Sequence, residues 1–248
     1  MDVLSSKDQN TPHTDIFWLT KMKSLILSAA FVALYIACSP SVAQWQWEVL
    51  DLGFAETQAD AGQYRAALSQ GEQVFGTYCM VCHGVEGAGM PGVPNLLDDE
   101  TLWGPELADM AYVIKYGIRS GHEKARFYQM PAYGEQESGV GYDAQLLIDL
   151  TYYVGSLRGE DVPADAVTRA EDTAINVCSE CHGFDFAGQV EWYGAPSLID
   201  DISLYGHDYA TVYDAIERGR EGESPVWENI LSDQQIRDVT LYIGSIRE

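Results

Sequence analysis

The sequence predicts an all-α protein with two consecutive domains built on one plan, and three observations support this. The motif Cys-x-x-Cys-His occurs at residues 79–83 and again at 178–182, a separation close to the length of a small domain. Residues 149–158 and 238–247 are also alike, because most positions are identical and the others exchange apolar side chains. No stretch shows the alternation of apolar and polar residues that is typical of strands. Such an internal repeat indicates two copies of one structural unit.

The repeat sets the expected boundaries. Residues 1–43 are expected to form an upstream extension and a signal peptide, and residues 44–63 a tail lying on the first domain. The first domain is expected over residues 64–160 and the second over 161–248, with a short linker between them.

The first domain shows the plan of the helices. Helical periodicity covers residues 64–78 and leads directly into the first motif. The stretch 84–102 is rich in Gly and Pro and predicts a loop. A helix is expected over 106–118, and a closing helix over 143–157 with Asp143 as its N-cap.

The N-terminal region predicts export. Lys21 and Lys23 come before an apolar run at 25–37, which is short for a membrane span but suits the core of a signal peptide. Residues 41–43, Ser-Val-Ala, offer a cleavage site. Because the residues before this region are polar, we expect translation to begin at Met22.

Cys38 lies outside both motifs, just after the apolar run. It is either removed with the signal peptide or carries a lipid anchor. Removal is favoured, because Tyr35 fits poorly among the small or aliphatic residues expected before a lipidated cysteine. In either case the mature domains keep only the motif cysteines, so no disulfide is implied.

The chain is strongly acidic, with 38 Asp and Glu against 14 Lys and Arg and a formal net charge of −24. The charges of the first 43 residues balance, so the whole excess lies downstream. This charge excludes nucleic acid as a partner and favours a basic docking surface on a protein partner. The solubility of an exported protein explains the acidity equally well.

The motif itself predicts covalent haem attachment. Cys79 and Cys82 lie about one helical turn apart, so both thiols can reach vinyl groups along one edge of a porphyrin, and His83 can then bind the iron. The second motif supplies the same set in Cys178, Cys181 and His182. We therefore expect two haem c groups. A four-thiolate zinc site or a redox dithiol are the alternatives, but neither requires a histidine directly after the second cysteine.

Each unit, a helix leading into the motif and a closing helix with an aromatic face, resembles the class I c-type cytochrome domain. The tandem arrangement is similar to the dihaem cytochrome c subunits of respiratory oxidases and of periplasmic dehydrogenases, and the resemblance covers residues 64–248. It implies two all-α domains, each with a few helices wrapped around one covalently bound haem. It also implies a periplasmic location, because haem attachment in such proteins takes place outside the inner membrane.

In that family the first and last helices of a domain cross at a small residue and an aromatic. The resemblance implies that Gly71 and Phe75 meet Tyr152 and Tyr153 in the first domain. The second domain departs from this pattern, because alanines stand at the positions that match Gly71 and Phe75.

For the first iron, the resemblance implies His83 as one ligand, held by the carbonyl of Pro94, and Met130 as the other. Met130 begins the segment Met-Pro-Ala-Tyr-Gly before the closing helix, which matches the family's Met-Pro pattern. A thioether ligand favours ferrous iron and raises the potential, as suits an electron carrier. The competing methionines are Met80, Met90 and Met110.

For the second iron, His182 is the expected ligand and the carbonyl of Pro196 its expected partner. The segment Ser-Pro-Val-Trp places Ser224 where a methionine is expected. Three options remain for the other ligand: His207, His122 from the first domain, or no strong protein ligand. The last is favoured, because both histidines fit surface positions.

These features predict an exported dihaem protein that is not itself an enzyme. It would carry electrons from a partner such as a dehydrogenase or a respiratory complex to an acceptor. The alternative is a haem enzyme of the peroxidase type, or a sensor of small ligands, acting at an open second haem. The missing methionine supports this alternative, whereas the lack of an evident His and Arg pair for peroxide chemistry opposes it.

Overall fold

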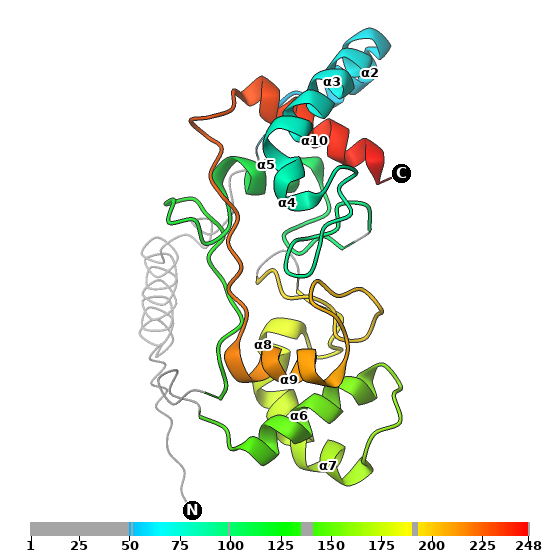
Figure 1. The fold of residues 1–248 in the computed structure, drawn as a ribbon, viewed down its shortest axis with the longest axis vertical. Helices are drawn as coiled ribbons and strands as arrows, with labels where there is room; N and C mark the ends of the chain where they lie inside the picture. The colour runs from blue at the N-terminus through cyan, green and yellow to red at the C-terminus, as the bar shows by residue number, and fades with distance from the viewer. Residues whose placement is uncertain (1–49, 51, 99, 135–140, 190–192, 248) are drawn as a thin grey trace, which may run out of the picture. The chain divides into compact units, whose positions relative to one another are not determined.

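The computed structural model describes residues 50, 52–98, 100–134, 141–189 and 193–247. The predicted signal peptide and Cys38 lie outside the described residues. Within these ranges the regular elements are helices, as predicted (Figure 1), and none of them is long and apolar enough to cross a membrane. In chain order they are α2 (Phe54–Ala59), α3 (Ala61–Val74), η2 (Phe75–Cys79), α4 (Met80–His83), α5 (Leu107–Tyr116), α6 (Ala144–Leu157), α7 (Ala164–Thr173), η4 (Ala174–Cys178), α8 (Ser179–His182), α9 (Tyr209–Arg218) and α10 (Asp233–Ile246).

In both repeats one continuous helical segment leads into the Cys-x-x-Cys-His motif. α3 runs into the π-helical turn η2 and then into α4, and α7 runs in the same way into η4 and α8. Each π-helical turn ends on the first cysteine of its motif, Cys79 or Cys178. Because π-helical turns are rare and often mark functional sites, their presence in both copies indicates that the motif requires this geometry.

Side-chain caps set the helix limits. Asp60 accepts hydrogen bonds from the backbone N–H groups of Gly62 and Gln63, so α3 begins earlier than the predicted residue 64. Asp143 caps α6 as predicted, by accepting a hydrogen bond of 2.8 Å from the N–H of Leu146.

The closing helices are exchanged between the repeats. α10, the last helix of the second repeat, packs along α3 and also contacts α5, whereas α6, the last helix of the first repeat, packs along α7 and α9 (Figure 1). We call α2 to α5 together with α10 the His83 unit, and α6 to α9 the His182 unit. The boundary predicted after residue 160 therefore divides the repeats, but it does not divide these two packing units.

The crossing of α3 and α10 depends on Gly71. A Cβ at this position would lie 2.1 Å from a backbone carbonyl oxygen of α10, and the Phe75 ring lies 5.6 Å from the ring of Tyr242. The prediction that Gly71 and Phe75 meet Tyr152 and Tyr153 of α6 is therefore wrong. Tyr242 holds in α10 the place that Tyr153 has in α6, so the sequence pattern alone does not decide which helix is the partner.

Two extended segments connect the units. Residues 117–134 follow α5, and residues 219–231 follow α9. The two run side by side (green and orange in Figure 1) and are joined by antiparallel bridges between Ile118 and Ser224 and between Met130 and Arg220. Each segment carries the chain out of the unit of its preceding helix and into the other unit, where the next closing helix packs.

Each unit has an apolar core of its own. Buried side chains of the His83 unit come from α3, η2, α5 and α10, and they include Ala67, Val74, Phe75, Ala111, Ile236, Val239 and Ile243. The predicted tail contains α2 and adds Leu50 and Phe54 to this core. The core of the His182 unit includes Leu147, Leu150, Tyr153, Ala170, Ala174, Phe186 and Ile216.

An ion pair also joins α6 to α7. Asp149 is 2% exposed, and its carboxylate accepts hydrogen bonds from Arg169 Nε at 2.7 Å and Nη2 at 2.8 Å. Gln145 Nε2 donates a further hydrogen bond of 2.9 Å. The contact with Arg169, and to a smaller extent that with Gln145, holds the pKa of the Asp149 carboxyl below its ordinary value.

Asp149→Asn is expected to lower the free energy of unfolding by about 1 to 3 kcal/mol at neutral pH, because hydrogen bonds to a charged group are lost. Since the native pKa is lowered, this stabilisation is complete above about pH 4 and disappears as the pH falls through the native pKa. Denaturant titrations at neutral pH and at about pH 3 measure both effects. Asp165→Asn, which removes an exposed partner of the same arginine, is the control and should change stability little. An equal loss at both pH values would contradict the assignment.

Candidate haem sites

The first motif presents its side chains from one short helical stretch. Cys79 ends η2, and Cys82 and His83 lie in α4. His83 Nδ1 lies 3.0 Å from the carbonyl oxygen of Pro94 in the following loop. When Nδ1 carries the proton and donates it to this carbonyl, Nε2 keeps the lone pair with which it can bind iron.

The second motif repeats this geometry. His182 Nδ1 lies 2.8 Å from the carbonyl oxygen of Pro196, so its Nε2 is equally available. His182 is buried, and burial lowers its pKa. The neutral imidazole, which is the form that binds a metal, is therefore favoured.

Burial raises the pKa of the first cysteine of each motif, Cys79 and Cys178, to about 11. A lowered pKa is typical of a reactive dithiol, so these two thiols do not resemble one. Among the described residues, no three of the His, Cys, Asp and Glu side chains gather into a metal site. The two cysteine pairs therefore do not converge on one four-thiolate zinc site.

A cavity adjoins the second motif. Cys178, Cys181 and His182 form part of its wall, and Met130 also lines it. Many of the other lining residues are apolar or aromatic, among them Leu150, Tyr153, Ala174, Phe186, Leu198, Val212 and Ile216. Two thiols, an imidazole and a thioether around a largely apolar cavity fit a haem that is attached at the motif.

Three arginines also line this cavity: Arg119, Arg158 and Arg220. The Arg220 guanidinium lies 4.7 Å from the centre of the Tyr205 ring and 3.0 Å from the carboxylate of Asp214. Guanidinium groups bind carboxylates well, so these side chains are candidates to meet haem propionates. Sequence reasoning missed Arg119 and Arg158, because the exchanged packing brings them from the first repeat to the second motif.

Met130 lines the cavity that adjoins the second motif and packs against the core of the His182 unit. The backbone N–H groups of Met130 and Arg220 each donate to the other residue's carbonyl at 3.0 Å. Gly219 permits this approach, because a Cβ there would lie 2.4 Å from the Met130 carbonyl oxygen. Chain order predicted that Met130 belongs with His83. The exchange of closing helices instead carries the Met130 segment into the His182 unit.

Ser224 holds the corresponding place in the His83 unit. Ser224 and Ile118 exchange backbone hydrogen bonds of 2.9 and 3.1 Å. A Cβ on Gly117 would lie 2.5 Å from the Ser224 carbonyl oxygen. The backbone arrangement around Met130 is therefore repeated around Ser224, at the end of α5 in the His83 unit.

Trp227 and Tyr133, three positions after Ser224 and Met130, also correspond to each other in their backbone contacts. The N–H of Trp227 donates to the carbonyl of Lys115 at 3.1 Å, as the N–H of Tyr133 donates to that of Ile216 at 3.0 Å. The Trp227 ring packs edge-on against Tyr78, with centroids 5.4 Å apart. Because Tyr78 directly precedes the first motif, Trp227 brings its segment to the first haem site.

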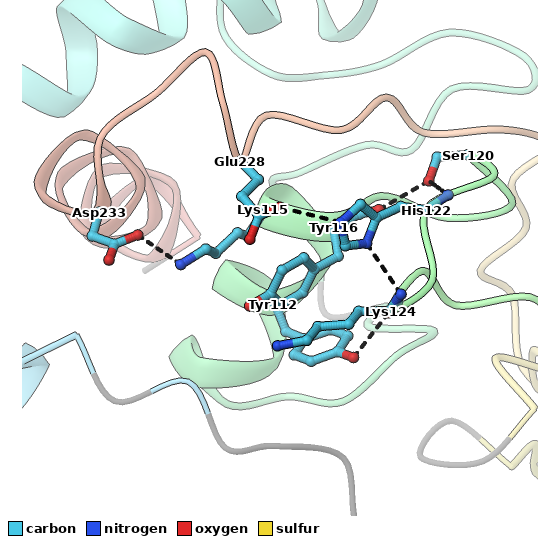
Figure 2. A network of polar contacts seen from close by, with 8 residues as sticks. All are labelled: Tyr112, Lys115, Tyr116, Ser120, His122, Lys124, Glu228 and Asp233. Atoms are coloured by element: carbon cyan, nitrogen blue, oxygen red, sulfur yellow. Dashed lines mark hydrogen bonds and ion pairs between the residues drawn. The ribbon is translucent and has the colours of Figure 1, made fainter.

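His122 is held in a polar network, which Figure 2 shows from close by. Its Nε2 lies 3.1 Å from Glu228 Oε2, and its Nδ1 accepts a hydrogen bond of 3.1 Å from the backbone N–H of Lys124. The ring also stacks on Tyr116, with centroids 5.2 Å apart. Both ring nitrogens have partners within the protein, so His122 is not poised to bind iron.

The other candidate iron ligands are His207 and three methionines, and they lie in different parts of the structure. His207 comes just before α9, whose N-cap is Asp208, and lines the cavity beside the second motif instead of lying at an exposed helix start. Met110 packs from α5 into the core of the His83 unit. Met80 and Met90 are 38% and 51% exposed.

Comparisons with known proteins agree with the repeat. The family described as cytochrome C oxidase, cbb3-type, subunit III matches residues 66–148 and again residues 165–243. The chain is similar to the cbb3-type cytochrome c oxidase subunit FixP of Bradyrhizobium sp. (strain ORS 278), with 40% identity over 194 residues that cover 77% of this chain and 65% of that relative. It is also similar to subunit CcoP of Cereibacter sphaeroides, with 37% identity over 191 residues, 76% of this chain and 64% of that relative. The chain thus spans a little under two thirds of the length of these relatives.

Proposed function

The chain belongs to the family of subunit III of cbb3-type cytochrome c oxidases, and from this premise we propose that it delivers electrons to an oxidase of that type. It is a dihaem c-type cytochrome of two tandem domains. In this proposal the protein is an electron-transfer subunit and not an enzyme in its own right.

The observation that carries the proposal is that Met130 and His182 line one cavity together with Cys178 and Cys181. We infer that His182 and Met130 would hold the iron of the second haem. His83 is the proximal ligand of the first iron, where Ser224 replaces the methionine. An imidazole and a thioether form a ligand pair typical of electron carriers with raised potential.

The bound haem supplies a one-electron iron couple, and the protein holds and tunes it. The carbonyls of Pro94 and Pro196, 3.0 and 2.8 Å from the histidine Nδ1 atoms, fix the ring orientation and make each imidazole a stronger donor. The Met130 thioether favours the ferrous form. The apolar walls of the cavity limit the access of water to the haem. This too favours the ferrous form and raises the redox potential.

The proposed partner presents a basic surface to this acidic chain, whose net charge is −24. The relatives are named as subunits of cbb3-type cytochrome c oxidases, and a respiratory complex is accordingly the partner we propose. We also propose that the haem domains act on the periplasmic side after export, with Cys38 either removed or lipidated.

Electron delivery to membranes tests this function. The purified protein should contain two haem groups and titrate as two reversible one-electron components. The reduced protein should be oxidised by membranes that contain a cbb3-type oxidase, and more slowly as the salt concentration rises, because screening weakens the attraction between opposite charges.

Matched membranes from a strain that lacks the oxidase are the control for this experiment. Oxidation at the same rate by both membranes would contradict the proposed partner. A haem content below two per chain would contradict the proposal that the protein carries electrons through two haem groups.

A further inference from the structure

We propose that the haem attached at the first motif takes a small uncharged ligand, such as carbon monoxide or nitric oxide, at the coordination position where Ser224 replaces a methionine. This inference rests on the proposed haem function and extends it, because a carrier with two protein ligands on each iron has no such position. It also assigns the open position to the His83 haem, whereas chain order assigned it to the His182 haem.

Ser224 and Met130 occupy equivalent backbone positions. Each is joined by paired backbone hydrogen bonds to the other extended segment: Ser224 to Ile118, just after α5, and Met130 to Arg220, just after α9. Each also packs its carbonyl against a glycine whose φ is positive, at +77° for Gly117 and +73° for Gly219. The two backbones are therefore alike, and the difference lies in the side chain. A serine hydroxyl is a poor ligand for haem iron compared with a thioether or an imidazole.

Two nitrogen-bearing side chains near the Ser224 segment, His122 and Lys115, have partners within the protein. His122 engages Glu228 and the Lys124 backbone through its two nitrogens (Figure 2). Lys115 Nζ is bound to Asp233 Oδ1 at 2.7 Å. The His122 contact ties the segment after α5 to the Ser224 segment, and the Lys115 contact ties α5 to the start of α10. The nitrogens of these two side chains are therefore already engaged within the protein.

The side chains beside this position favour one kind of ligand. Trp227 packs against Tyr78 beside the first motif, so the segment that carries Ser224 brings an aromatic surface to the site. An apolar surface disfavours charged ligands, because a charge loses its hydration there, and it admits neutral diatomic molecules.

Carbon monoxide titration of the reduced holoprotein tests the proposal. The wild type is expected to bind one equivalent per chain. Ser224→Met should bind none and should show a second low-spin haem, because the thioether fills the position. Ser224→Ala is the matched control, since it alters the same residue without adding a ligand, and it should still bind one equivalent.

The position of the ligand is read from amide NMR of the wild type during the titration. Shift changes are expected to centre on residues 84–96, the loop that follows His83. Changes centred on residues 183–198 would place the ligand at the other haem and overturn the proposal.

The absence of binding in the wild type, or binding that Ser224→Met leaves intact, would also overturn it. If binding appears only in Met110→Ala, then Met110 is the ligand and the proposal fails. In each of these cases the proposed electron-carrier function is still supported if the protein shows two reversible haem components. A haem content below two per chain would contradict that function as well.

Discussion

Replacing Met130 with alanine is expected to turn the His182 haem from low-spin to high-spin in the oxidised protein. The thioether beside His182 is lost, and the smaller side chain leaves the iron with a weak ligand or water. The sulfur charge-transfer band should disappear. The potential of this haem should fall by on the order of 0.1 V, since axial ligands set haem potentials over a span of about 0.8 V. Optical and EPR spectra with a redox titration measure these changes.

Two variants serve as controls for this experiment. His207→Ala alters another residue of the same cavity, and Met110→Ala alters a methionine packed in the core of the His83 unit. Both should keep the sulfur band and the potential. If His207→Ala removes a low-spin signal and Met130→Ala does not, then His207 is the axial ligand and our assignment is incorrect.

Gly71→Ala is expected to destabilise the protein by about 2 to 3 kcal/mol, because the new methyl group has no space. Its Cβ would lie 2.1 Å from the carbonyl oxygen of Asp238 and 2.7 Å from Tyr242 Cβ. The carbonyl belongs to the backbone of α10, so α3 and α10 must separate to admit the methyl group. Denaturant unfolding of the holoprotein, followed by circular dichroism, measures the loss.

Gly76→Ala is the matched control. Gly76 lies in η2, a few residues along the same helical segment, and a Cβ there would meet nothing within 4 Å. Its stability should equal or slightly exceed that of the wild type, since alanine is the better helix former. Equal losses in the two variants would mean that helical strain, and not contact with α10, causes the effect.

The local structure of the haem sites could be predicted from the sequence, because it depends on residues close together in the chain. The spacing of Cys79, Cys82 and His83 determines which side chains share one helical turn. The loop after each histidine is short, so it can return a prolyl carbonyl to the imidazole. The Asp143 cap of α6 is likewise a local contact.

The pairing of helices could not be predicted, because the two closing helices present nearly the same residues. Residues 149–158 and 238–247 share their Asp, Thr, Tyr, Gly, Ser and Arg positions, so either helix offers the same kind of face to α3. Specific contacts differ, as in the ion pair of Asp149 with Arg169, but such pairs are visible only once the helices are together. The location of Met130 in the His182 unit follows from this pairing, so the ligand combination that we propose could not be predicted from the sequence.

The most direct test of the account is to find which closing helix lies against α3. Gln70 of α3 and Gln234 of α10 are exposed, and Gln234 Nε2 donates to Gln70 Oε1 at 3.2 Å. Gln145 is the exposed residue of α6 that matches Gln234 in the repeat.

Cysteines are introduced in the pairs Gln70→Cys with Gln234→Cys and Gln70→Cys with Gln145→Cys, and the monomeric holoprotein is treated with a short bismaleimide. The account predicts an intramolecular cross-link between positions 70 and 234 and none between 70 and 145. A cross-link between 70 and 145 alone would show that the helices pair in chain order. It would return Met130 to the His83 iron and contradict the account.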